Sequence, residues 1–144
     1  MNERSGRRIW WVLCIAWLAV IFGQSMLPAE LSQAESTGLL ARLAKALPFL
    51  TEALLRKLAH FSEFFVLGFL LAKCLPARFA LPALLALLCA LGDETIQLFV
   101  PGRSGQVRDI WIDFAGAAAA IALTLPVWKR TLRTRGPDRP GPGS

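Results

Sequence analysis

The sequence lacks the motifs by which most small enzymes are recognised. It has no glycine-rich nucleotide loop, no serine nucleophile elbow and no HExxH zinc motif. It contains one histidine, and its three cysteines, Cys14, Cys74 and Cys89, have no metal-like spacing. Because each cysteine falls within or beside an apolar run, we expect free thiols that act as small apolar residues. These absences leave enzymatic activity undecided and favour a protein that is not an enzyme.

The composition is typical of a membrane protein. The 144 residues are 55% hydrophobic with a mean hydropathy of +0.50, and the apolar residues come in blocks rather than at amphipathic spacing. The net charge is +6, but the basic residues gather at the two termini with no nucleic-acid recognition motif between them. We therefore expect a small integral membrane protein with no nucleic-acid partner.

Four apolar runs are long enough to cross a bilayer, which requires about 20 residues. They predict an all-α fold, a four-span transmembrane helical bundle within residues 1–128, with spans at about 9–27, 54–75, 79–100 and 108–128. A cleaved signal peptide is the alternative for the first run, but that run is long for one and no small-x-small cleavage site follows it. Residues 129–144 predict a basic, disordered tail.

The segment between spans one and two has a different pattern. From Pro28 to Pro48 its leucines fall at helical spacing, with basic residues on other faces. A short amphipathic helix lying at the membrane interface is predicted, and a plain connecting loop is the alternative. Thr51 and Glu52 are then typical of a helix start, with Thr51 as the cap.

The positive charges predict the orientation. With four spans, both termini lie on the same side as the turn between spans two and three, and that side holds ten of the 16 lysines and arginines. The positive-inside rule makes this side cytoplasmic. The loop at residues 101–107 is then expected outside the cell.

The stretch from Gly92 to Gly116 carries four carboxylates and two arginines between two apolar segments. An aspartate at the centre of a membrane helix costs roughly 2.5–3.5 kcal/mol, so such residues are functional or at least paired. In the predicted topology this stretch meets the start of span two at the extracytoplasmic end. The candidate functional cluster comprises Lys57, His60, Glu63, Asp93, Glu94, Gln97, Arg103, Arg108, Asp109 and Asp113.

Helical spacing places these residues on shared faces. In span two, Lys57, His60 and Glu63 recur every third residue. In span three, Asp93 and Gln97 are one turn apart, whereas the acid next to Asp93 is rotated by about a hundred degrees. Apart from that acid, the polar residues of these two spans each face a common side.

Span four combines acids with small residues. Asp109, Asp113, Gly116 and Ala120 fall on one stripe, and small residues there let another helix approach closely. We expect this stripe to face the interior of the bundle.

Structural roles are the alternative for several members of the cluster. His60 could be a buried histidine bonded to a carbonyl, Lys57 a residue reaching to the interface, and Asp109 a first-turn acid on the helix macrodipole. Arg103 could close the loop by pairing with one of the acids at the end of span three.

These residues together resemble the VanZ-like family of bacterial membrane proteins. The resemblance covers roughly residues 56–120. Its motifs are Lys57, His60 and Glu63, then Asp93-Glu94 with Gln97, then Pro101-Gly102-Arg103, then Asp109, Asp113 and Gly116. Through the founding member of the family, the resemblance implies a helical protein of the bacterial inner membrane, linked to teicoplanin resistance and the cell envelope. It implies no settled biochemical activity.

A divalent cation is the one cofactor that the residues suggest. One histidine together with Glu63, Asp93, Glu94 and Asp113 would suit Mg²⁺ or Mn²⁺ better than Zn²⁺. No other cofactor is evident, and the sequence leaves the metal and the oligomeric state open, including a homo-oligomer.

Three function classes follow, in order of preference. The first is an envelope factor that binds an anionic lipid or a lipid-linked precursor through Lys57, Arg103 and Arg108. The second is an intramembrane enzyme with His60 and a carboxylate as acid and base. The third is a proton-coupled transporter subunit whose buried carboxylates load and release protons.

Overall fold

The computed structural model describes residues 3–28, 30, 51–76, 78–103 and 105–134. This part of the chain forms α-helices and no strands, so the predicted all-α class is confirmed. The helices are α1 (Glu3–Ser25), α3 (Glu52–Cys74), α4 (Ala80–Leu98) and α5 (Val107–Thr134). The interfacial helix predicted between Pro28 and Pro48 falls almost wholly outside the described residues.

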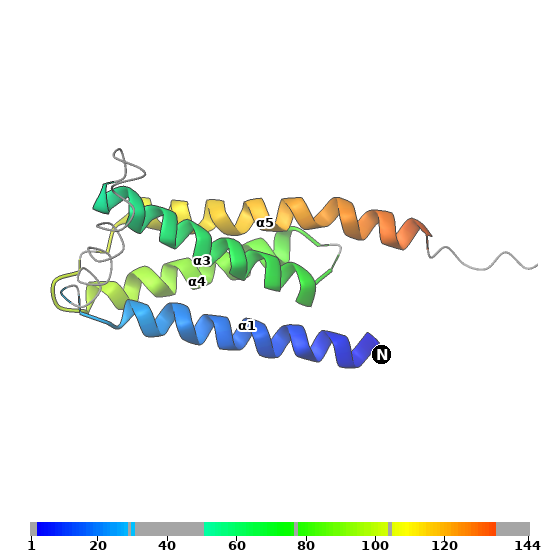
Figure 1. Cartoon of the computed structure of the whole chain (residues 1–144), viewed down its shortest axis with the longest axis horizontal. Coiled ribbons are helices and arrows are strands. Elements are labelled where there is room, and N and C mark those ends of the chain that lie inside the picture. Colours follow the sequence, from blue (N-terminus) through cyan, green and yellow to red (C-terminus); the bar gives the residue numbers. More distant parts are fainter. Residues whose placement is uncertain (1–2, 29, 31–50, 77, 104, 135–144) are drawn as a thin grey trace, which may run out of the picture.

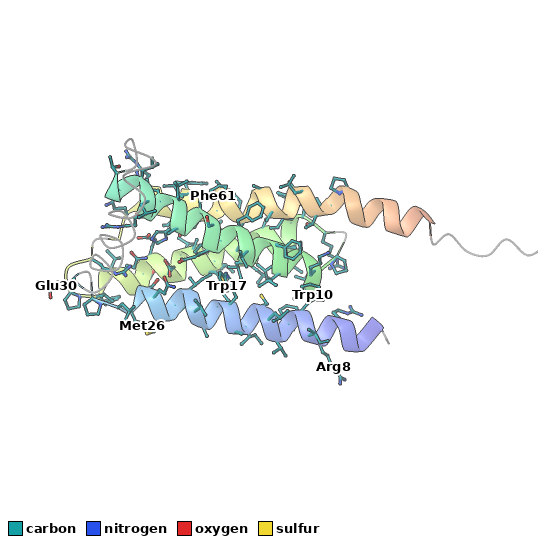
Figure 2. All side chains as sticks on the ribbon, viewed as in Figure 1. Arg8, Trp10, Trp17, Met26, Glu30 and Phe61 are labelled. Carbon is teal, nitrogen blue, oxygen red and sulfur yellow. The ribbon has the colours of Figure 1, made fainter. Side chains whose placement is uncertain are left out.

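The helices lie side by side and alternate in direction along the chain (Figure 1). The start of α1 and the end of α5 are therefore at the same end of the bundle. The end of α1, the start of α3 and the α4–α5 loop lie at the opposite end. Figure 2 shows Arg8 and Trp10 toward the first end, and Met26 and Glu30 at the second.

Three of the helices are long and apolar enough to cross a membrane. They are Gly6–Ser25 of α1, Ala80–Leu98 and Val107–Pro126 of α5. Many large apolar side chains of α1 and α4, including Val12 and Leu88, point outward and are exposed. A water-soluble surface rarely carries so much apolar area, whereas lipid tails accommodate it.

The fourth helix, α3, is as long as α1 but has a more polar first half. Its 23 residues include Arg56, Lys57, His60 and Glu63, and this concentration of ionisable residues keeps it from the group of helices that could cross a membrane by composition. Thr51 caps its start as predicted, because the Thr51 hydroxyl accepts a hydrogen bond of 3.2 Å from the Leu54 amide.

The last helix continues beyond the predicted span. It runs through Pro126 and ends at Thr134, so the predicted boundary at residue 129 lies inside it. The sequence of this extension is rich in lysine and arginine, and cations near a helix C-terminus interact favourably with the macrodipole. Residues 135–144 lie outside the described part of the chain.

Helices α3 and α5 pack at backbone contact. A Cβ atom added to Gly68 would meet the backbone of Ala117, and one added to Gly116 would meet the backbone of Phe61. Such small residues allow membrane helices to associate closely. Ala120 is also buried, so the predicted stripe of α5 faces the interior.

The apolar core fills the space between α1, α3 and α4. Phe64 and Leu67 of α3 are fully buried there beside Ile21 of α1. Cys14 and Cys74 belong to the same core, and all three cysteines are free, as the sequence predicts.

The close packing predicts the effect of two substitutions. Gly68→Ala and Gly116→Ala should each lower the free energy of unfolding by about 1–3 kcal/mol, because a backbone rather than a flexible side chain occupies the added volume. Thermal unfolding in detergent measures the change. Gly23→Ala is the matched control: nothing lies within 4 Å of its added Cβ, so it should be neutral or stabilising. Equal behaviour of the three variants would contradict the backbone contact.

Candidate functional site

The centre of the polar cluster is a contact between α3 and α5. The Nδ1 atom of His60 lies 3.3 Å from Oδ1 of Asp113, and the side chains are 12% and 0% exposed. Neither atom has an aligned hydrogen-bond partner, so the contact is an ion pair if His60 is protonated. Gly116, one turn beyond Asp113, allows the approach of α3 that brings the imidazole to the acid.

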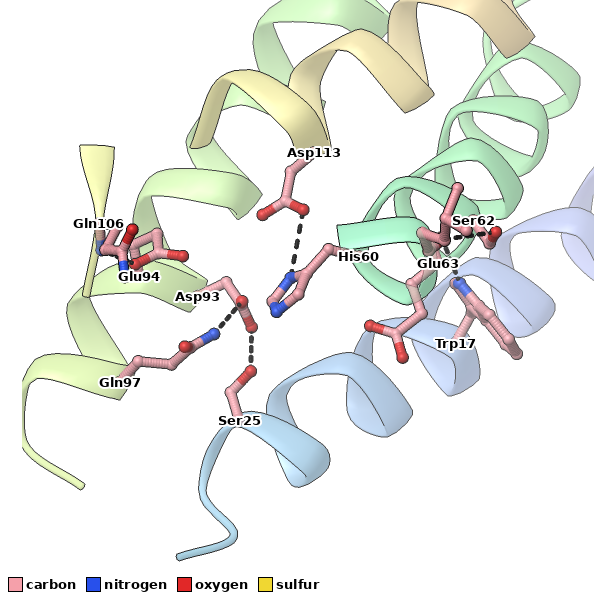
Figure 3. A network of polar contacts seen from close by, with 11 residues as sticks. Trp17, Ser25, His60, Ser62, Glu63, Asp93, Glu94, Gln97, Gln106 and Asp113 are labelled. Atoms are coloured by element: carbon pink, nitrogen blue, oxygen red, sulfur yellow. Dashed lines mark hydrogen bonds and ion pairs between the residues drawn. The ribbon is translucent and has the colours of Figure 1, made fainter. Parts of the chain in front are cut away.

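Asp93 of α4 reaches the same place from the other side (Figure 3). Its Oδ1 accepts a short hydrogen bond from the Ser25 hydroxyl at the end of α1, and its Oδ2 accepts one of 2.8 Å from Nε2 of Gln97. The Gln97 bond joins residues one turn apart, as the shared face predicts. In this view the His60 ring lies below the Asp113 carboxylate and beside that of Asp93.

Glu63 extends the cluster along α3 toward α1. Its carboxylate lies on the same side of α3 as the His60 ring (Figure 3). The indole Nε1 of Trp17 donates a 2.9 Å hydrogen bond to the Glu63 backbone carbonyl. This bond fixes α1 against the turn of α3 that carries the histidine.

Glu94 faces the start of α5 rather than His60. It is buried, and its Oε2 accepts a 2.7 Å hydrogen bond from the amide of Gln106 in the α4–α5 loop. Its other oxygen and Oδ1 of Asp109 are buried without a hydrogen-bond partner. The rotation of about a hundred degrees from Asp93 accounts for this second direction.

Arg103 makes a different contact from the one predicted. Its Nε donates to the Leu27 carbonyl at 2.9 Å and its Nη2 to the Gln24 carbonyl at 3.1 Å. The arginine therefore donates to two carbonyls at the end of α1, and the Gln24 carbonyl also accepts a turn hydrogen bond of 3.1 Å from the Leu27 amide. Burial lowers the pKa of the Arg103 guanidinium from its ordinary value, and the nearby Asp93 carboxylate opposes that shift.

The pairing alternative for Arg103 is thus not observed. Among the residues that the structure describes, His60 pairs with Asp113, and no acid of α4 pairs with Arg103. The loop is closed instead by Arg103 and by Gly102, whose φ of 76° is a conformation that glycine adopts readily.

The remaining two cations lie at the margin of the cluster. Lys57 is half-buried one turn before His60, and Arg108 is exposed in the first turn of α5. The structure thus brings the histidine, Asp93, Asp113, Gln97 and Glu63 together. It leaves Lys57 and Arg108 on the outer rim and turns Glu94 toward the loop.

Sequence reasoning missed three supporting residues: Ser25, Gln106 and Trp17. One feature of the sequence could have indicated Ser25 as a site residue: Gln24-Ser25 is a polar pair at the end of an otherwise apolar run. The Gln106 contact uses its own backbone amide, and the Trp17 contact uses the backbone carbonyl of Glu63; the sequence carries no signal for either.

The site is rich in polar atoms whose hydrogen bonds are unmade. His60 Nδ1, Glu94 Oε1, Asp109 Oδ1 and both carboxylate oxygens of Asp113 are buried without a hydrogen-bond partner among the described residues. More than about nine in ten buried polar groups in proteins are paired, and leaving one unpaired costs about 1–3 kcal/mol. Such a concentration can bind a polar or charged ligand, position a proton, or hold a cation.

An apolar groove lies elsewhere on the bundle. It has a volume of about 350 Å³ and runs between α3 and α5. None of the polar cluster lines it; the lining residues are Phe65, Phe69, Lys73, Ala120, Leu123 and Thr124. Its apolar walls suit a hydrocarbon chain rather than a headgroup.

Comparison with known proteins gives a family match. The family model described as VanZ/LLP1 matches residues 10–129. No curated protein and no solved structure matches the chain. The matched range includes all four described helices except the ends of α1 and α5, and all of the cluster.

The contacts of Arg103 predict its role in stability. Arg103→Ala should lower the free energy of unfolding by about 1–2 kcal/mol, because two backbone carbonyls of the α1 end lose a charged donor. Arg108→Ala, which removes an exposed arginine, should change it by less than about 0.5 kcal/mol. Chemical unfolding in detergent gives both values.

A double variant separates this role from acid pairing. If Arg103 balanced the charge of Glu94, then Arg103→Ala with Glu94→Gln would recover stability relative to Arg103→Ala alone. Because Glu94 bonds to the Gln106 amide instead, we expect no recovery. Recovery in the double variant would show that the two side chains form a pair.

Proposed function

Because the chain belongs to the VanZ/LLP1 family, we propose that it is an envelope factor of the bacterial inner membrane that contributes to teicoplanin resistance. In this proposal the polar cluster binds the anionic headgroup of a membrane lipid or of a lipid-linked cell-wall precursor. The link to teicoplanin rests on the family resemblance. The binding role rests on the site.

The observation that carries the proposal is the group of buried polar atoms without partners. They lie in a bundle of which three helices could cross a membrane, and near the end at which α1 finishes and the α4–α5 loop lies. Their unmade hydrogen bonds are a cost of roughly 1–3 kcal/mol each that a polar ligand would recover. If the cluster served only to stabilise the fold, these missing hydrogen bonds would be a cost without a benefit.

Lys57 and Arg108 provide the charge for an anionic ligand. Both are at the rim of the cluster, at the depth where phosphate headgroups lie if the bundle crosses the membrane. Two nitrogens of Arg103 donate hydrogen bonds to the end of α1. Arg103 therefore contributes its positive charge to ligand binding rather than a bidentate hydrogen bond.

The topology in this proposal has four spans, with α3 crossing beside the other three. Two features support it: α3 packs against α5 at backbone contact, and its 23 residues match the length of α1. The charge count puts both termini in the cytoplasm and the polar cluster on the outer side.

Acid–base catalysis is the second candidate function, and the geometry of His60 favours it. A carboxylate that holds an imidazole is the arrangement that orients a general base. With Asp93 also near the ring, His60 could move a proton at a lipid-linked phosphate. A turnover assay on such a substrate would distinguish this reading from binding alone.

The topology predicts the accessibility of two positions. In a background with the native cysteines replaced by alanine, Gln106→Cys in the α4–α5 loop should react with a membrane-impermeant thiol reagent in intact cells. Arg78→Cys in the α3–α4 turn should react only after the cells are opened. Both native residues are exposed in the bundle, so the difference reports the side of the membrane. The reverse pattern would put the cluster on the cytoplasmic side.

The resistance proposal predicts a drug-specific effect. Expressed in a sensitive Gram-positive host, the protein should raise teicoplanin tolerance more than vancomycin tolerance. Asp113→Asn and Glu63→Gln keep shape and remove charge, and at equal protein levels each should abolish the effect. Glu30→Gln removes a carboxylate that is exposed outside the cluster, and it should retain the effect.

Lipids that copurify with the protein give a second measurement. Mass spectrometry should detect a retained phosphate-bearing lipid that Lys57→Gln reduces and Glu30→Gln does not. Full resistance in both carboxylate variants would show that the cluster is structural. An inserted parent protein that changes neither drug tolerance nor lipid retention would refute the proposed function.

A further inference from the structure

We infer that His60, Asp93 and Asp113 form a binding site for one divalent metal cation. Each of these residues offers a ligand atom, and the three atoms lie within 4.8 Å of one another. They come from α3, α4 and α5, so the site forms only when the three helices are assembled. Cation binding at these residues is independent of any lipid ligand.

The spacing of the three atoms fits a shared cation. Metal–ligand distances are about 2.0–2.6 Å for nitrogen and carboxylate oxygen, so atoms on opposite sides of one ion are roughly 4–5 Å apart. Adjacent ligands are closer, at about 3 Å, and the 3.3 Å between His60 Nδ1 and Asp113 Oδ1 is of that size. The three helices thus hold the ligand atoms at a spacing that one ion can bridge.

Asp113 is the strongest single indication. It is fully buried, and neither of its carboxylate oxygens has a hydrogen-bond partner. The unprotonated Nδ1 of a neutral imidazole carries a lone pair, and facing a carboxylate oxygen at 3.3 Å it would be repelled. A proton or a cation between the two atoms removes that repulsion, and a cation also serves the free Asp113 oxygens.

The Asp93 carboxylate is oriented by hydrogen bonds from neighbouring side chains, as metal-binding carboxylates usually are. Ser25 and Gln97 each donate to one of its oxygens, which fixes the carboxylate and leaves lone pairs on both atoms. Ligating carboxylates are regularly hydrogen-bonded in this way by groups outside the coordination sphere. Through Ser25, the end of α1 takes part in forming the site.

The donor set selects the kind of cation. Two carboxylates and one imidazole provide mostly hard oxygen ligands with no thiolate, because the cysteines lie in the apolar core. Such a set favours Mg²⁺ or Mn²⁺, with water or a ligand oxygen completing the coordination. Two negative charges from the protein would balance the ion and remove the cost of burying the carboxylates unpaired.

Mn²⁺ is the appropriate probe, because its electron paramagnetic resonance spectrum reports both affinity and ligand type. His60 is the single histidine of the chain, so in protein without a histidine tag a directly bound imidazole nitrogen can come only from this residue. We expect the full chain in detergent to bind one Mn²⁺ with a ¹⁴N coupling in the pulsed spectrum. Mg²⁺ should displace it, and Mn²⁺ should raise the unfolding temperature.

Four variants test the assignment. Asp113→Asn, Asp93→Asn and His60→Gln should each weaken Mn²⁺ binding at least tenfold, and His60→Gln should also lose the ¹⁴N coupling. Glu30→Gln, which removes an exposed carboxylate outside the cluster, should bind within about threefold of the parent. Unfolding temperatures without metal show which variants are folded.

Three results would overturn the site. They are no Mn²⁺ binding by the folded parent, binding without the nitrogen coupling, and binding that the folded Asp113→Asn or Asp93→Asn variant retains in full. In each case His60 and Asp113 form an ion pair alone. A bound Mn²⁺ together with unchanged teicoplanin tolerance would support the site and count only against the proposed resistance function.

Discussion

The burial of Asp113 is the constraint on which the arrangement of the bundle depends. A carboxylate that leaves water costs several kcal/mol even after relaxation, and here only the His60 ring opposes its charge directly. Gly116 is placed one turn away, so that α3 comes close enough to bring the ring to the acid. Asp93, with its own two hydrogen bonds, completes a polar centre between apolar helices.

Much of this centre could be predicted from the spacing of residues. Asp113, Gly116 and Ala120 share a helical stripe, and the structure buries all three. The recurrence of His60 and Glu63 on one face likewise anticipates a cluster at one end of the bundle. Such predictions succeed because they depend only on the helical repeat and on the cost of exposing charge to lipid.

The rest depends on the tertiary path of α1, which no local pattern encodes. Ser25 reaches Asp93 over a separation of 68 residues, and Arg103 finds backbone carbonyls of α1 rather than an acid. A carbonyl acceptor is present at every residue, so the sequence could not single out Gln24 and Leu27. The sequence prediction ended the last helix too early. The polar, basic residues after position 128 are typical of a disordered tail, but basic residues are also favourable at a helix C-terminus.

The backbone contact between α3 and α5 has a mechanical consequence. With Gly68 against Ala117 and Gly116 against Phe61, neither helix can slide past the other without driving side chains into a backbone, so His60 and Asp113 travel as parts of one body. Helix α1 is not interlocked in this way: an atom added at Gly92 of α4 would meet Phe22 at 3.8 Å, an ordinary contact. Its C-terminal end is held through Ser25 and Arg103, and its middle through the hydrogen bond from Trp17 to the Glu63 carbonyl. The α3–α5 pair is therefore the rigid part of the site, and α1 completes the polar centre through hydrogen bonds and apolar side-chain contacts.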